Sequence, residues 1–170
     1  MRRKASLSKS IMIGFTAGFV GAWAMNGFFA LQSRIAGDTN GDDQQQQQAQ
    51  RENDNPTVKV ADAIVSSVGA GPLDDEQKEF AGQAVHYVFG GLMGALYAVM
   101  VRLVPPARIG FGTAYATALW VGADEVMVPA LKLSPPPTES PVSQHLAGLG
   151  AHLSYGLALE ATRRLLHAAK

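Results

Sequence analysis

The chain has 170 residues, with 14 basic and 14 acidic side chains and therefore a formal net charge of zero. This balance excludes the concentrated basic face that nucleic-acid binding requires. The sequence contains no cysteine, which excludes disulfides, a thiolate nucleophile and cysteine-ligated zinc or iron–sulfur centres. Ten of the 14 acids lie between Asp38 and Glu79, so the rest of the chain is far more apolar than its average.

Four stretches are long and apolar enough to be predicted as membrane-spanning helices. Residues 11–31, 80–101 and 140–159 contain no Lys, Arg, Asp or Glu, and residues 109–131 contain only Asp124 and Glu125 as charged residues. Because about 20 apolar residues cross a bilayer, we predict an all-α, four-helix transmembrane bundle. The predicted spans cover residues 11–31, 80–104, 107–131 and 141–166.

Basic residues are distributed unevenly between the two sides of this bundle. Nine lie in the amino-terminal segment 1–10, in the turn between the second and third spans, or in the carboxyl tail, whereas five lie on the opposite side. The positive-inside rule therefore predicts that both termini are cytoplasmic. The first apolar run exceeds the h-region of a signal peptide and no small-x-small cleavage pattern follows it, so we predict an uncleaved anchor.

The two outer loops differ in stiffness. The long polar loop 32–79 contains five consecutive glutamines, and its composition predicts disorder over 37–56. Apolar residues at helical spacing predict a short amphipathic helix over 58–70, which lies on the outer membrane surface or packs on the span ends. The Pro-rich loop 132–140 predicts a stiff connector.

An internal match indicates a duplicated two-helix hairpin. Residues 81–90 and 147–156 share the pattern A-G-x-x-x-H-x-x-aromatic-G. The first and third spans share a weaker pattern, in which a Thr-Ala pair at Thr16 and at Thr113 precedes a tryptophan by seven residues. Chance matching of small residues in apolar helices is the alternative, and it is more serious for the weaker pair.

Glycines at four-residue spacing predict close helix packing, because small residues let helix backbones approach in lipid. The predicted packing residues are Gly14, Gly18, Gly82, Gly90, Gly94, Gly148 and Gly156. Four short helices enclose little space, so a conducting pathway would need a homo-oligomer assembled through the Gly14/Gly18 or the Gly90/Gly94 face. Five aromatic residues lie within spans and are expected to serve packing more than an interfacial belt: Trp23, Trp120, Tyr97, Tyr115 and Tyr155.

All four spans place a polar group at a similar depth in the outer half. The predicted intramembrane polar site consists of Asn26, His86, Asp124, Glu125 and His152. An unpaired acid at a helix centre costs about 2.5–3.5 kcal/mol on insertion scales, so these groups should face inward and be paired. Adjacent helical residues differ by about 100° in direction, so the two acids need different partners. We expect one acid to meet a histidine and the other to be protonated or to face a neighbouring subunit.

Three interpretations of this layer remain open. It fixes helix register through hydrogen bonds, it binds protons or small cations, or it holds a metal ion between histidines and a carboxylate. No HExxH or ExxH spacing supports the metal. His145, seven residues before His152 on the same face, is either a vestibule group or an interfacial residue. Glu160 with Arg163 and Arg164 is predicted to form a helix-end salt bridge.

The sequence contains no phosphate-binding glycine loop, no G-x-S-x-G elbow and no serine–histidine constellation. It therefore predicts no enzyme activity, no catalytic residue and no cofactor. Two functions remain: ion- or proton-linked transport, relevant to acid stress, or a non-catalytic membrane scaffold or accessory subunit.

The carboxyl half resembles the YagU-like family of bacterial inner-membrane proteins, a family of unknown molecular function. The resemblance covers residues 80–167 and, loosely, the first span. It rests on the segment PALKLSPP from Pro129, on His145, on GAHL from Gly150 and on LEATRR from Leu159. It implies a polytopic protein of the bacterial inner membrane, with the lipid bilayer as its main partner, and it supplies no established catalytic residue.

Overall fold

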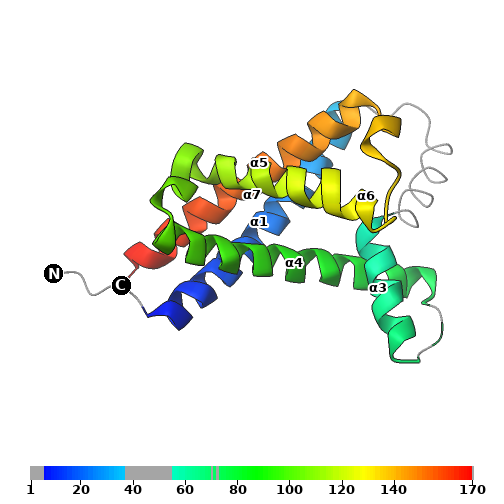
Figure 1. The fold of residues 1–170 in the computed structure, drawn as a ribbon, viewed down its shortest axis with the longest axis horizontal. Helices are drawn as coiled ribbons and strands as arrows, with labels where there is room; N and C mark the ends of the chain where they lie inside the picture. Colours follow the sequence, from blue (N-terminus) through cyan, green and yellow to red (C-terminus); the bar gives the residue numbers. More distant parts are fainter. Residues whose placement is uncertain (1–5, 37–54, 70, 72, 170) are drawn as a thin grey trace.

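The fold is all-α in a computed structural model that describes residues 6–36, 55–69, 71 and 73–169 (Figure 1). Most of the segment predicted to be disordered, 37–56, lies outside the described residues, but Asn55 and Pro56 already belong to a helix start. The helical elements are α1 (Leu7–Ala36), α3 (Pro56–Ser67), α4 (Asp75–Leu103), a 3₁₀ turn η1 (Pro105–Gly112), α5 (Thr113–Trp120), a π-helix η2 (Val121–Met127), α6 (Val128–Ala130), a 3₁₀ turn η3 (Pro137–Glu139) and α7 (Val142–Ala168).

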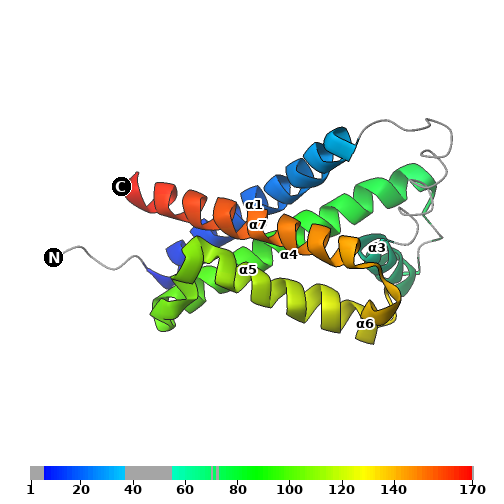
Figure 2. The same cartoon turned by 90° about the horizontal axis from the view of Figure 1, so that it is seen from above.

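The long helices run back and forth along one axis (Figures 1 and 2). The start of α1, the end of α4, η1 and the end of α7 lie at one end, which we call the basic end. The opposite end carries α3, α6 and the connector, residues 131–141 between α6 and α7. Among the described residues, two helices are long and apolar enough to cross a membrane: Leu7–Ile35 and Asp75–Leu103.

The other two predicted spans are less regular than the apolar pattern indicated. The third begins at Thr113 and not at residue 107, because Gly110, Phe111 and Gly112 all have positive φ and interrupt the helix. It then changes to π geometry before it ends at Ala130. The fourth, α7, carries Glu160 and two arginines in its last third.

Helices α1 and α4 cross at a point where each of the two helices carries glycines. A methyl group on Gly18 would overlap the Gly90 carbonyl and Gly94, and one on Gly14 would overlap Ala98 and the Gly94 carbonyl. The backbones therefore lie in direct contact, as expected for small residues at a helix crossing. This corrects the predicted assembly surface: the Gly14/Gly18 and Gly90/Gly94 faces pack against each other within one chain and are not available to a second copy.

Helices α5 and α7 cross with the same type of contact. A methyl group on Gly156 would meet the Gly112 carbonyl and the Ala116 side chain, just as one on Gly90 would meet the Gly18 carbonyl and Ala22. This equivalence supports the repeat in the second helix of each hairpin. It also corrects the register of the first helices, because Gly18 corresponds to Gly112 and the two Thr-Ala pairs do not correspond.

Three tyrosines join the two hairpins in the core. Tyr97, Tyr115 and Tyr155 cluster with Leu159, and the rings of Tyr97 and Tyr115 lie 4.8 Å apart between centroids. The Tyr155 hydroxyl donates to the Gly90 carbonyl at 2.6 Å, and the Tyr115 hydroxyl donates to the Met93 carbonyl at 2.7 Å. The packing role predicted for the tyrosines is confirmed, whereas the one predicted for Trp23 is wrong, because its side chain is 68% exposed.

Helix α3 packs on the amino-terminal part of α4. Asn55 caps its first turn by accepting from the Thr57 N–H, and Val58 is buried against Gly82. Lys59 Nζ donates to the Leu133 carbonyl of the connector at 3.1 Å. Of the two predictions for this segment, packing on the helix ends is the one that the contacts support.

Candidate functional site

The two acids of the predicted polar site lie in the π-helix η2. Pro129 has no N–H to bond the Glu125 carbonyl, and its ring disfavours α geometry in the preceding turn. The Val128 N–H reaches back to the Ala123 carbonyl, five residues earlier, which is the π pattern. Single π turns in helices frequently occur at functional sites. The wide turn presents Asp124 and Glu125 toward α7.

Glu125 is paired with His145. His145 Nδ1 lies 2.7 Å from Glu125 Oε1, and its Nε2 lies 3.0 Å from the Pro137 carbonyl oxygen. The Glu125 side chain is 20% exposed, and that of His145 is 25% exposed. His145 lies in the first turn of α7, next to the connector.

Asp124 lies near His152, two helical turns deeper along α7. His152 Nδ1 donates to the Gly148 carbonyl at 3.0 Å and lies 3.7 Å from Asp124 Oδ2. The His152 side chain is 8% exposed, whereas that of Asp124 is 45% exposed. Asp124 is thus within ion-pair distance of the imidazole and keeps an open side.

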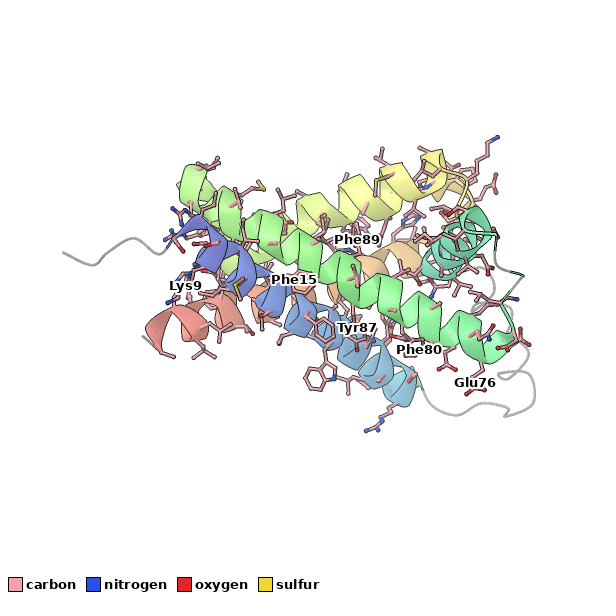
Figure 3. All side chains as sticks on the ribbon, turned by 90° about the horizontal axis from the view of Figure 1, so that it is seen from below. Lys9, Phe15, Glu76, Phe80, Tyr87 and Phe89 are labelled. Carbon is pink, nitrogen blue, oxygen red and sulfur yellow. The ribbon has the colours of Figure 1, made fainter. Side chains whose placement is uncertain are left out.

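The remaining polar residues form a separate group between α1 and α4. Asn26 Nδ2 donates to Gln83 Oε1 at 3.2 Å and to the Tyr87 hydroxyl at 3.1 Å. His86 Nε2 donates to the Ala22 carbonyl at 3.3 Å. Tyr87 also stacks on Phe19 with ring centroids 4.6 Å apart, on the α1–α4 face shown in Figure 3.

The predicted single layer is therefore two clusters. One joins Asn26 and His86 to the α1–α4 crossing, and the other sets Asp124 and Glu125 against α7. The acids do have different partners, as expected, but both meet a histidine. Over the part of the chain that the structure describes, no group of three His, Asp or Glu side chains can hold a metal ion.

From the sequence, His145 was predicted to be either a vestibule group or an interfacial residue. Its spacing of seven from His152 places both rings on one face of α7, and this was the available signal. The spacing could not show that Glu125 reaches His145, because that contact depends on the π turn and on the path of the connector.

A second ionic cluster lies at the basic end. Glu160 is fully buried, and its carboxylate accepts from Arg163 Nε at 2.6 Å and from Arg164 Nε at 2.6 Å. It also accepts from the Tyr97 hydroxyl at 2.9 Å. The predicted salt bridge is present, but it is a buried network that ties α7 to α4 and not a surface pair.

A family model described as "Protein of unknown function (DUF1440)" matches residues 47–161. The chain belongs to the DUF1440 family. The matched part of this DUF1440 protein runs from before α3 into α7, so it contains both carboxylate–histidine pairs, whereas α1 lies outside it. No curated protein and no solved structure matches the chain.

Proposed function

We propose that this DUF1440 protein is a four-span protein of the bacterial inner membrane and that its carboxylate–histidine pairs exchange protons in the outer half of the bilayer. The resemblance to YagU-like proteins supports the location. The observation that carries the proton role is the π-helix η2, which sets two consecutive carboxylates against two histidines on one face of α7.

The exposed surface supports the membrane location. Large apolar side chains are exposed along the length of every long helix, whereas much of the interior consists of small residues and tyrosines. Trp23 is 68% exposed, Val88 51% and Leu146 63%. Contiguous apolar patches of this extent are rare on soluble monomers, and they suit lipid chains.

Charge supports the proposed orientation. Lys9, Arg102, Arg108 and Arg164 belong to the basic end, whereas α4 begins at the opposite end with Asp75 and Glu76. The positive-inside rule places the basic end in the cytoplasm. Fusions of a periplasm-active reporter after residue 50 should therefore be active and cytoplasm-active reporters inactive; the reverse pattern would overturn the orientation.

Proton exchange follows from the chemistry of the pairs. Imidazole and carboxylate together gain and lose protons near neutral pH, and ionisable groups within membranes commonly mark ion pathways. Asp124 keeps an open side, and Glu125 reaches the connector through His145. Such a protein could serve under acid stress, with a pathway completed in a homo-oligomer through its exposed apolar faces.

Flux through purified protein in liposomes tests this role. A pH gradient should drive proton or small-cation movement, and Asp124→Asn should abolish it while the protein stays folded. Asp75→Asn is the matched control, because Asp75 is 95% exposed at the start of α4 and lies outside both pairs. Absence of flux in the unsubstituted protein under every gradient would favour the second function, a scaffold or accessory subunit.

The scaffold function has an observation of its own. Among the described residues that are not exposed, no buried side-chain nitrogen or oxygen lacks a hydrogen-bond partner. A network that is satisfied within the chain fixes helix register without any ligand. The flux experiment separates the two functions, because a register-fixing pair requires no proton movement.

A further inference from the structure

The two nitrogens of His145 both face hydrogen-bond acceptors. Nε2 lies 3.0 Å from the Pro137 carbonyl oxygen, which can only accept, and Nδ1 lies 2.7 Å from a carboxylate oxygen of Glu125. A neutral imidazole has one N–H and cannot donate to both. The arrangement is complete only when the pair holds one additional proton, either on the ring or on the Glu125 carboxyl.

We propose that Glu125, His145 and the Pro137 carbonyl form a one-proton binding site that latches the connector to the η2–α7 pair. With the proton bound, the ring joins η2 to η3. When the proton leaves, one of the two acceptors loses its donor, either the Pro137 carbonyl or Glu125, and in both cases the ring no longer joins the connector to η2. The latch itself is inferred from the contacts of His145 with Glu125 and Pro137. Its further role, regulation of the Asp124–His152 pair, rests on the proposed function.

The surroundings of His145 leave Glu125 as the charged group that governs this proton. From η2, Asp124 is directed at His152 and not at His145. From α3, Lys59 donates to the connector at the Leu133 carbonyl. The connector contributes Lys132 and Glu139 as charged residues, and His152 lies two turns away on α7. Among the described residues, the ion pair of His145 is with Glu125.

The direction of the pH response follows from which state is stabilised. The proton-bound pair is the state favoured by the folded geometry, because only then do both ring nitrogens have a hydrogen-bond partner of the right kind. The latch is therefore closed in acid and opens as the pH rises. Release in alkali, and not in acid, is the signature of this site.

A spin label on the connector measures the latch directly. The chain has no native cysteine, so Thr138→Cys, at an exposed position of η3, gives a single nitroxide site in the full-length protein. We expect one transition from an immobile to a mobile spectrum as the pH rises from about 5 to about 10. His145→Ala in this background should be mobile at every pH.

Glu125→Gln provides the sharper variant, because its amide can donate to the unprotonated Nδ1 and leave Nε2–H for Pro137. The latch should then stay closed at every pH. Asp124→Asn is the matched control and should keep the transition. A transition that survives in Glu125→Gln, or a spectrum independent of pH in the unsubstituted protein, would overturn the proposal.

Failure of the latch and failure of the proposed function give different results. Loss of the spin-label transition with proton flux intact rejects the latch alone. A transition without flux rejects proton transport and leaves a pH-sensitive scaffold.

Discussion

The hydroxyl of Tyr155 donates a hydrogen bond of 2.6 Å to the backbone carbonyl of Gly90. Gly90 has no side chain, and this lets both α1 and the Tyr155 ring approach the same turn of α4. One residue therefore couples the crossing of the first hairpin to the last helix. Gly90 and Tyr155 therefore pack together with α1 at a single position in the core.

Tyr155→Phe should lower the free energy of unfolding by about 1 kcal/mol, because the ring is retained and one buried hydrogen bond is lost. Thermal or denaturant unfolding in detergent measures this change. Tyr115→Phe should have a similar effect through the Met93 carbonyl. Unchanged stability in both variants would mean that these two bonds do not form.

Gly94→Ala should destabilise the protein by about 1–3 kcal/mol, because the added methyl group overlaps the backbone of Gly14 and Gly18. Gly27→Ala is the matched control, since no atom lies within 4 Å of its added methyl group. The control should be neutral or stabilising by up to about 1 kcal/mol through helix propensity. Equal effects of the two changes would show that α1 and α4 do not cross at these glycines.

Glu160→Gln should lower the free energy of unfolding by about 3–5 kcal/mol, more than any other single polar substitution, because it leaves Arg163 without its buried charged partner. Asp75→Asn, which removes an exposed partner of Lys78, should change stability by less than about 0.5 kcal/mol. The comparison uses the same unfolding measurement for both. A small change in the free energy of unfolding for Glu160→Gln would mean that this carboxylate is exposed to water and not buried.

Stability should fall as the pH rises past neutrality, and His145 should account for part of the fall. Its ring nitrogens lie against two acceptors, Glu125 Oε1 at 2.7 Å and the Pro137 carbonyl oxygen at 3.0 Å, so its contribution requires the bound proton and is lost as the pH rises. Unfolding midpoints measured between about pH 6 and about pH 9 test this. The slope should become smaller in His145→Ala; an unchanged slope would contradict it.

Much of the architecture could be predicted because it depends on local patterns. The apolar runs predicted where the long helices lie, and Asp74 with Gln77 forms the capping box that starts α4 just before the apolar run. The glycine spacing indicated close packing. It could not indicate the partner, because a small-residue face fits a second copy as well as another helix of the same chain.

The candidate site was predicted in composition but not in arrangement. Depth along a helix can be counted from the sequence, so the two acids and His152 were expected at a similar depth and one acid was expected to meet a histidine, whereas in the structure both acids do. Direction around the helix could not be counted, because the π turn before Pro129 changes the angle per residue. His86 and Asn26 were grouped with the acids because they lie at a similar depth, although they bond across the α1–α4 crossing.

The sequence by itself determined an all-helical chain, its apolar stretches, its acidic and basic segments and the repeated His-and-glycine pattern, since these are properties of residues close along the chain. Only the tertiary structure decided that the two glycine faces meet each other, that Glu160 is buried beneath Tyr97, and that His145 joins Glu125 to the connector. Apart from the bond between His145 and Pro137, these contacts join residues separated by 20 or more positions. They depend on crossing angles and on one widened helical turn, and no local pattern specifies either.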